Sequence, residues 1–302
     1  MIYDTIIIGA GPAGLTAAIY LKRANKSVLV LEKETFGGQI THSPKVENYP
    51  GFITVSGVEF ADKLVDQAMN QGADIDMDEA KSIIKEGDIF TVKGDRADYQ
   101  SKTVILATGS KHRTLGLEGE EKFTGEGISY CAVCDGAFYK DMDIAVIGGG
   151  NSALQEAILL SKTSKSVTVI QNLPFLTGES KLIEQIESTD NIKVILSSVV
   201  AKLLGEDKFE GITIKNEETG NETDLSFDGI FVAIGQKPEN ESFSDAVNLD
   251  ERGYITADES CIPEGENGIF VAGDCRTKAV RQIATAISDG AAASVAVCKY
   301  LG

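Results

Sequence analysis

Two stretches of the chain repeat one pattern of apolar and polar positions. In each, a short apolar run leads into a glycine-rich turn, a segment with helical periodicity follows, and a second short apolar run closes the pattern. An apolar run that ends in glycines predicts a buried strand, and the segment behind the turn predicts a helix. Strands are expected at 3–8, 27–31, 143–147 and 166–170, and helices at 15–23 and 154–160. Each stretch is a strand–helix–strand unit of nucleotide-binding length.

Further apolar segments complete two sheets. Residues 103–107 and 230–233 look like strands that return to a sheet, residues 268–272 form another strand, and residues 281–300 are rich in Ala with a helical pattern. Because this last segment resembles the end of a dinucleotide fold, we assign it to the first domain. The predicted fold is α/β, with two Rossmann-like dinucleotide-binding domains and the second inserted in the first. The domains are 1–115 with 241–302, and 116–240.

Composition narrows the classes of partner. The 302 residues suffice for two domains, and a formal net charge of -18 argues against binding nucleic acid or an anionic membrane through a general positive field. No leader pattern and no apolar run of about 20 residues is present, so we expect a cytosolic protein. Of the five cysteines, only Cys131 and Cys134 have a recognisable spacing. The remaining three, Cys261, Cys275 and Cys298, are expected to be packing residues.

The first glycine-rich turn reads Gly9-Ala10-Gly11-Pro12-Ala13-Gly14. In such a turn the first glycine permits the tight bend, the second lets the backbone approach a pyrophosphate, and the third lets helix pack against strand. Glu32 follows the second strand, where a carboxylate can accept hydrogen bonds from an adenosine ribose. This context favours a dinucleotide site over a ligand-free turn.

The second turn reads Gly148-Gly149-Gly150-Asn151-Ser152-Ala153, but Gln171 stands where the acidic residue is expected. A carboxylate there favours NADH and arginines nearby favour NADPH; neither is present. Losing two or three charged hydrogen bonds, each worth about 1.5–3 kcal/mol, weakens nucleotide binding by orders of magnitude. A fold retained without its ligand is favoured, and direct contacts from Gln171 and Asn172 to the ribose are the alternative.

A pair of cysteines lies just before the second unit, in Cys131-Ala132-Val133-Cys134-Asp135-Gly136. Two thiols at this spacing suit reversible dithiol–disulfide exchange, and Asp135 is placed to shuttle a proton. Zinc is the rival interpretation. It requires further cysteines or suitably spaced histidines, which His42 and His112 do not supply, so no metal site is predicted.

These motifs together resemble the low-molecular-weight thioredoxin reductase family over nearly the whole chain. The segments that carry the resemblance, in that family's order, are residues 9–14, 37–39, 46–51, 107–109, 131–136, 273–274 and 281–282. The resemblance implies a homodimer of two-domain subunits, with FAD on the first domain and the redox cysteines on the second. It also implies that one domain rotates against the other, so that the cysteines face the flavin and the protein substrate in turn.

The resemblance also assigns roles to residues. It implies that Cys134 lies nearer the flavin, that Cys131 attacks the disulfide of thioredoxin, and that Asp135 is the acid and base. The cofactor-binding residues that it implies, with those of the glycine-rich turn, are Gly9, Gly11, Pro12, Ala13, Gly14, Glu32, Gly38, Gln39, Asn48, Ala107, Gly109, Asp274, Arg281 and Gln282.

One segment departs from the family's pattern. NADPH-dependent members carry a His-Arg-Arg sequence and a further Arg after the second domain's second strand, where this chain reads Gln171-Asn172-Leu173-Pro174-Phe175-Leu176-Thr177. A smaller group in the family lacks that cluster and takes its electrons from reduced ferredoxin. We therefore predict a ferredoxin-dependent thioredoxin reductase.

Because ferredoxins are usually acidic, a local basic surface is required, and the candidate members are Lys111, Arg113, Lys278 and Arg281. Other candidates for these charges are contacts to FAD phosphates and ordinary solvated side chains. Three other functions stay open: an NAD(P)H-dependent thioredoxin reductase, a ferredoxin or flavodoxin reductase of the same architecture, and a non-catalytic flavin-binding interaction protein. The second would leave the paired cysteines without a use.

Overall fold

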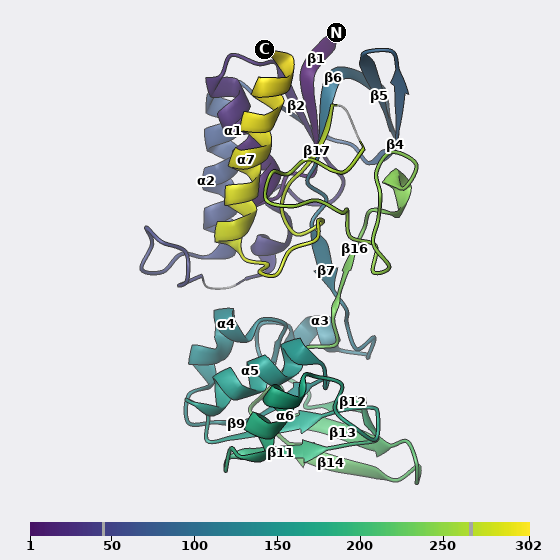
Figure 1. The fold of residues 1–302 in the computed structure, drawn as a ribbon. Coiled ribbons are helices and arrows are strands. Elements are labelled where there is room, and N and C mark those ends of the chain that lie inside the picture. Colours follow the sequence, from purple (N-terminus) through teal and green to yellow (C-terminus); the bar gives the residue numbers. More distant parts are fainter. Residues whose placement is uncertain (44–45, 266–267) are drawn as a thin grey trace. The chain divides into compact units, whose positions relative to one another are not determined.

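A computed structural model describes residues 1–43, 46–265 and 268–302, which form two compact units. The first comprises Met1–Lys111 and Lys237–Gly302, and the second His112–Gln236. The strands that carry the chain across the boundary, β7 (Ser110–His112) and β16 (Gln236–Pro238), pair with each other (Figure 1). The boundaries expected from the sequence, 115/116 and 240/241, differ by a few residues because these short polar strands carry no apolar run.

The first unit is built, in its described residues, on a seven-stranded sheet with the order β3-β2-β1-β6-β5-β4. Strand β6 pairs in parallel with β1 and, through its second half, with β17, while its first half pairs antiparallel with β5. The strands are β1 (Ile2–Ile8), β2 (Val28–Glu32), β3 (Asp74–Met77), β4 (Ala80–Glu86), β5 (Ile89–Gly94), β6 (Asp98–Leu106) and β17 (Ile269–Val271).

The central strands are apolar on both faces. In β1, Ile7 packs into one buried cluster, and Ile6 and Ile8 pack into another. Alternate side chains of a strand point to opposite faces, so a strand with apolar side chains at every position must be covered on both sides. The apolar run Ile6-Ile7-Ile8 at the end of segment 3–8 is therefore covered on both sides, in agreement with the predicted buried strand.

Helices α1 (Pro12–Arg23), α2 (Gly57–Asn70) and α7 (Ile283–Leu301) cover one face of this sheet (Figure 1). Helix α1 begins three residues before the predicted start because Pro12 occupies its first turn, where the missing N–H costs nothing. Helices α1 and α7 approach closely at Gly290, where an added Cβ would lie 2.2 Å from the carbonyl oxygen of Ala13. Two short 3-10 segments, η1 (Gly38–His42) and η3 (Glu241–Phe243), complete the unit.

The second unit holds a parallel sheet of five described strands in the order β11-β10-β9-β15-β8. These are β8 (Ile128–Ser129), β9 (Asp143–Ile147), β10 (Ser166–Ile170), β11 (Ile192–Ile195) and β15 (Gly229–Val232). Strands β9 and β10 have the predicted bounds. Ile144 and Val146 face one buried cluster and Ala145 and Ile147 the other, so both faces are again covered.

Helices α5 (Asn151–Ser161) and α6 (Ser180–Glu187) lie on one face of this sheet and a three-stranded antiparallel sheet on the other (Figure 1). That smaller sheet consists of β12 (Ser198–Leu204), β13 (Gly211–Asn216) and β14 (Glu222–Ser226), and three short helical segments are α3 (Glu120–Phe123), α4 (Ala132–Asp135) and η2 (Gly136–Tyr139). The predicted α/β fold with two Rossmann-like domains is confirmed. No helix of the described residues is long and apolar enough to cross a membrane.

Helix α5 contains a carboxyl group buried without compensation. Burial raises the pKa of Glu156 to about 7, and its Oε2 has no hydrogen-bond partner among the described residues. In the unfolded chain a glutamate titrates near pH 4.3. Since the folded-state pKa is the higher one, ionisation costs stability as the pH rises from about 4 to 7, and the cost is complete above pH 7.

We expect Glu156→Gln to stabilise the protein in a pH-dependent manner. The neutral amide avoids ionisation, so the free energy of unfolding should rise by roughly 2–3 kcal/mol at pH 8 and change little at pH 4. Urea unfolding at the two pH values measures this. Glu184→Gln, an exposed position on α6, is the matched control. An equal effect of Glu156→Gln at both pH values would contradict the assignment.

Candidate functional site

The first glycine-rich turn joins β1 to α1 and leaves space above its middle glycine. Gly9 has a φ of +109°, and an added Cβ there would lie 2.3 Å from the carbonyl oxygen of Ala107. At Gly14 the Cβ would lie 1.9 Å from the carbonyl oxygen of Gly9. The nearest atom to a Cβ at Gly11 is 4.0 Å away, the carbonyl oxygen of Gly37. Gly9 and Gly14 are therefore required for packing, whereas Gly11 opens onto the N-terminus of α1, where anions bind.

Glu32, at the end of β2, holds this turn in place. Its carboxylate accepts hydrogen bonds from the backbone N–H groups of Ala10 at 2.8 Å and Glu34 at 2.9 Å. A carboxylate accepts about four hydrogen bonds, so capacity remains for a ligand hydroxyl.

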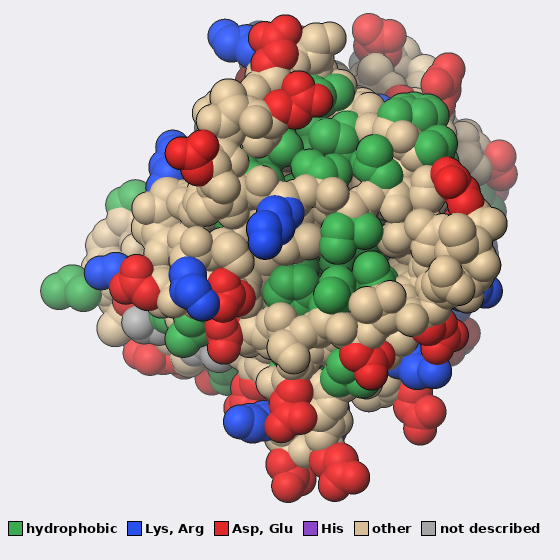
Figure 2. Space-filling model, turned by 90° about the horizontal axis from the view of Figure 1, so that it is seen from below, with side chains coloured by type: hydrophobic (Ala, Val, Ile, Leu, Met, Phe, Trp, Pro, Cys, Tyr) green, Lys and Arg blue, Asp and Glu red, His purple; other side chains and the backbone are tan. Residues whose placement is uncertain are grey.

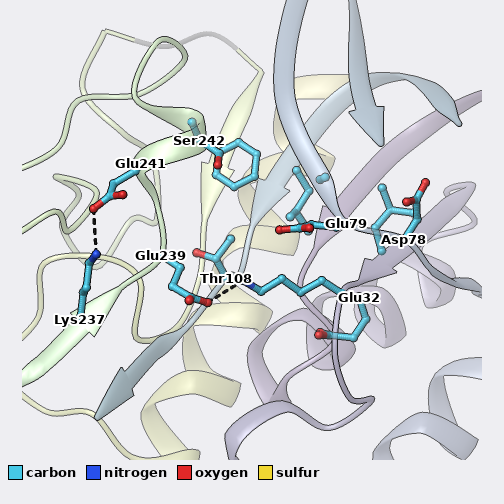
Figure 3. A pocket seen from close by; sticks show the side chains of 14 residues that line it. Glu32, Asp78, Glu79, Thr108, Lys237, Glu239, Glu241 and Ser242 are labelled. Carbon is cyan, nitrogen blue, oxygen red and sulfur yellow. Dashed lines mark hydrogen bonds and ion pairs between the residues drawn. The ribbon is translucent and has the colours of Figure 1, made fainter. Parts of the chain in front are cut away.

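A cavity of about 250 Å³ adjoins Glu32 and Gly9 within the first unit. Figure 3 shows the side chains of Glu32, Glu79 and Glu239 around it. Carboxylates accept hydrogen bonds from hydroxyl groups, so this lining suits a ribose better than a phosphate. The lining also includes Lys33 and Lys237, but these cations pair with Glu239 at 2.7 Å and Glu241 at 3.1 Å. Further lining residues include Ile8, Leu31, Asp78, Thr108 and Phe243.

The loop after β2 folds back on the same turn. The backbone N–H of Gly37 donates to the carbonyl oxygen of Ala10 at 2.8 Å, and a Cβ at Gly38 would lie 3.2 Å from Cα of Gly11. Gln39 follows in η1. The first glycine-rich turn and the segment Gly37-Gly38 thus lie against each other, and together they form the glycine cradle.

Two other predicted residues lie together although they are far apart in sequence. Asn48 Nδ2 donates to Oε1 of Gln282 at 3.1 Å, and Gln282 is the N-cap of α7, where it forms a capping box with Thr285. The N-terminus of α7 therefore brings Asn48 and Gln282 to one place in the first unit.

Asp274 follows β17 and carries an unsatisfied buried oxygen. Its Oδ1 has no hydrogen-bond partner among the described residues, although Lys278 Nζ lies 4.0 Å away. Burial raises the pKa of this carboxyl to about 6. A buried acceptor without a donor is costly, and a hydroxyl-bearing ligand would satisfy it.

Arg281 is held by the first unit itself. Its guanidinium stacks 4.1 Å from the ring centre of Tyr254 and donates to the carbonyl oxygens of Asp274, Arg276 and Lys278. Gly109 has a φ of +69°, and its neighbour Thr108 donates to the buried Asn240 at 2.6 Å. Asn240 also bonds the carbonyl oxygens of Gly253 and Cys275, a function that no sequence pattern indicated.

A buried ion cluster next to Asp274 was also missed from the sequence. Asp289 on α7 accepts two hydrogen bonds from Arg276, both at 2.9 Å, and one from Lys278 at 2.9 Å. It also accepts from the backbone N–H of Gly273 at 3.0 Å. These two cations hold the pKa of Asp289 below its usual range despite burial. The cluster attaches the loop that contains Asp274 to helix α7.

The cysteine pair lies in the second unit. Cys131 and Cys134 form a disulfide with a Cα–Cα distance of 5.3 Å, and both side chains are half-buried. Cys131 is the N-cap of the single turn α4, where its Sγ accepts a hydrogen bond from the backbone N–H of Cys134 at 3.2 Å. This bond favours negative charge on the Cys131 sulfur when the pair is reduced.

Asp135 ends the same turn. Burial raises the pKa of its carboxyl, and a hydrogen bond from Ser129 Oγ to Oδ2 at 2.7 Å acts in the opposite direction. A carboxyl with a raised pKa beside a redox disulfide is suited to proton transfer.

The second glycine-rich turn is lined by the uncharged segment 171–177. The Gln171 side chain is buried, and a Cβ at Gly149 would lie 2.6 Å from its Cδ. Thr177 donates through its backbone N–H to the carbonyl oxygen of Gly149 at 2.8 Å. No lysine or arginine occurs in 171–177. This loop therefore offers a 2'-phosphate no cation.

The three basic candidates of the first unit do not form one exposed patch. Lys278 is buried on Asp289, and Lys111 pairs with Glu34 at 2.6 Å and Glu239 at 3.5 Å. Arg281 stacks on Tyr254 and donates to three backbone carbonyl oxygens. Arg113 belongs to the second unit. On the face that Figure 2 shows, hydrophobic side chains gather near the centre with one basic side chain among them, and acidic side chains lie mostly around the edge. The prediction of Lys278 as part of a basic surface is wrong, because its side chain is buried on Asp289.

Residues 3–290 match the family described as Pyridine nucleotide-disulphide oxidoreductase, and the chain belongs to that family. It is 41% identical over 300 residues to the "34.2 kDa protein in rubredoxin operon" of Clostridium pasteurianum, covering 99% of this chain and 97% of that protein. It is 39% identical over 303 residues to thioredoxin reductase of Bacillus subtilis, covering 99% and 95%. The crystal structure of thioredoxin reductase from Streptococcus pyogenes superposes with a TM-score of 0.93 at 41% identity, covering 99% and 98%.

Within the family, the chain groups with the thioredoxin reductases of low molecular weight, as predicted. These relatives confirm the prediction of a flavoprotein oxidoreductase that binds FAD. The first unit fits FAD, because the open cradle at Gly11 suits a pyrophosphate and the unsatisfied Asp274 suits a hydroxyl. The electron donor is not determined by these relatives.

Proposed function

We propose that this protein reduces the disulfide of thioredoxin through FAD and the Cys131–Cys134 pair, with reduced ferredoxin as the electron donor. The observation that carries the choice of donor is the uncharged segment 171–177 around the second glycine-rich turn. Without a carboxylate for the ribose or arginines for a 2'-phosphate, this turn lacks the contacts that select NADH or NADPH. The second unit then uses its nucleotide-type fold to carry the cysteines.

Bound FAD would supply the redox chemistry that links a one-electron donor to the two-electron reduction of the disulfide. In the reduced protein, the Cys131 sulfur gives its proton to Asp135, attacks one sulfur of the thioredoxin disulfide and forms a mixed disulfide, and the other thioredoxin sulfur leaves as a thiolate. Cys134 then attacks the Cys131 sulfur, which releases dithiol thioredoxin and restores the disulfide. The backbone N–H of Cys134 assists by stabilising charge on Cys131.

Asp135 is the proton carrier in this proposal. It accepts the proton of the attacking thiol and returns it to the leaving thiolate, and burial adjusts its pKa toward that of a thiol. Its place on the same helical turn as both cysteines supports this function.

The first unit would bind FAD at the residues implied by resemblance. The glycine cradle of Gly9, Gly11 and Gly14 would take the pyrophosphate with the N-terminus of α1, where Pro12 and Ala13 begin the helix. Glu32 would accept from the ribose and Asp274 from a further hydroxyl. The remaining proposed contacts are Gly38, Gln39, Asn48, Ala107, Gly109, Arg281 and Gln282.

The driving force supports a ferredoxin donor. A plant-type ferredoxin near -400 mV and a thioredoxin near -270 mV differ by about 130 mV, or roughly 6 kcal/mol for two electrons. One relative is named for its place in a rubredoxin operon. On the resemblance to the low-molecular-weight thioredoxin reductases, we also propose that the active protein is a homodimer in the cytosol.

The donor can be identified by anaerobic titration of the yellow protein in the presence of oxidised thioredoxin. We expect chemically reduced ferredoxin to bleach the flavin absorbance and to generate thioredoxin thiols, and excess NADPH or NADH to do neither within minutes. Thioredoxin reductase of Bacillus subtilis is the control protein. Bleaching by NADPH within seconds would instead support an NAD(P)H-dependent enzyme in which Gln171 and Asn172 bond the ribose.

A further inference from the structure

Ser129 carries a buried hydroxyl group that contacts both Cys131 and Asp135 of the redox motif. It ends β8, the edge strand of the second unit's sheet, where it pairs in parallel register with Phe231 of β15. The residue is 4% exposed. A residue fixed by a sheet and buried against it has little freedom, so its hydroxyl is held in one place.

The hydroxyl joins Asp135 to Cys131. Ser129 Oγ donates to Oδ2 of Asp135 at 2.7 Å and accepts from the backbone N–H of Cys131 at 3.1 Å. A hydroxyl has one proton to donate, and the short bond to an acidic oxygen is the stronger use of it. Its other contact, to the carbonyl oxygen of Cys131 at 3.5 Å, is at the limit of a hydrogen bond.

We propose that Ser129 is a positioning residue for disulfide exchange: its hydroxyl donates to the Asp135 carboxylate, which favours the ionised form, and fixes that carboxylate relative to the backbone of Cys131. The inference rests on the proposed function, in which Asp135 takes the proton of the attacking thiol. That step is balanced, because the Cys131 S–H proton passes to Asp135 as the Cys131 sulfur bonds a thioredoxin sulfur and the thioredoxin S–S bond breaks.

The other ionisable groups near Asp135 do not replace this contact. Burial and, as a smaller contribution, the charge of Asp135 raise the pKa of the Tyr139 phenol on η2. On α5, which packs against α4, Glu156 has its pKa raised by burial alone. No cation among the described residues lowers the pKa of Asp135, and Ser129 supplies the one lowering contact.

Removing the hydroxyl should shift the pH dependence of thioredoxin reduction. Without the donor from Ser129, burial raises the pKa of Asp135 further, so a higher pH is needed to ionise it. In Ser129→Ala, the acid limb of the rate of thioredoxin reduction by the pre-reduced holoenzyme should move up by about one pH unit. The rate should fall about tenfold on that limb and less than about twofold on the plateau. Ser129→Thr, which keeps the hydroxyl, should restore the wild-type profile.

A structural function for Ser129 gives a different result. It would lower the rate by a similar factor at every pH and leave the position of the acid limb unchanged, which would overturn the inference. If Ser129→Ala yields no folded protein, Asp135→Glu provides a second test, since one added methylene displaces the carboxylate from the hydroxyl of Ser129. An unshifted acid limb in Asp135→Glu would likewise overturn the inference.

The double variant separates this inference from the proposed function. If Ser129 acts through Asp135, Ser129→Ala should cause no further shift in an Asp135→Asn background. An additional shift of the same size there would overturn the inference while leaving the function of Asp135 intact. If Asp135→Asn alone keeps the wild-type profile, the proposed function of Asp135 fails, and the positioning inference fails with it.

Discussion

Cys134→Ser is expected to abolish catalytic reduction of thioredoxin while the protein remains yellow. Cys131 and Cys134 act as a unit, since one sulfur must resolve the mixed disulfide that the other forms, so turnover should fall at least about a thousandfold. FAD should stay bound because both cysteines belong to the second unit and the glycine cradle to the first. Steady-state formation of thioredoxin thiols and the flavin absorbance measure the two properties.

The single thiol left in this variant gives a second readout. Cys131 should still release one equivalent of thiol from a small aryl disulfide, because its Sγ remains beside the Cys134 backbone N–H. Cys298→Ser is the matched control, since Cys298 lies on α7 of the first unit and should not affect turnover. Turnover of Cys134→Ser above about a tenth of the wild-type rate would contradict the proposed exchange.

Asp289→Ala should strongly destabilise the first unit. It leaves the cations of Arg276 and Lys278 buried without their partner. Breaking a buried pair from one side costs about 3–5 kcal/mol, because a charge remains desolvated and unpaired. Urea unfolding of the holoprotein, followed by circular dichroism, measures the loss.

A surface ion pair of the same unit gives the comparison. Lys63 pairs with Glu59 at 2.6 Å, but both side chains are more than half exposed. Lys63→Ala should therefore change the free energy of unfolding by less than about 0.5 kcal/mol. Equal losses from Lys63→Ala and Asp289→Ala would show that the buried cluster contributes no more than a solvated pair.

The parts of the fold that the sequence predicted are those with continuous apolar runs. The strands at 143–147 and 166–170 have the expected bounds because their side chains are buried on both faces of a parallel sheet. Helix α5 begins at Asn151, before the predicted 154, since the glycine-rich turn passes directly into it. The three-stranded sheet was missed because strands such as β14 are mostly exposed and polar.

In the candidate site, too, the residues with a local sequence pattern were predicted and those without one were missed. Glu32 and the glycines were found because a nucleotide cradle requires a fixed local spacing. Asp289 was not, because its partners Arg276 and Lys278 come from another segment and an aspartate within an Ala-rich helix has no local signature. Ser129 was also missed, since a serine two residues before a cysteine indicates nothing until β8 and α4 are folded.

The insertion of one unit within the other sets an order for folding during synthesis. Strand β6 of the first unit pairs with β17, which follows the whole of the second unit in the chain. Helix α7, which packs on α1, also comes after it. A ribosome therefore releases all of His112–Gln236 before the first unit can close its sheet. The unit that carries the cysteines can fold while the amino-terminal half of the other still lacks its last strand and helix.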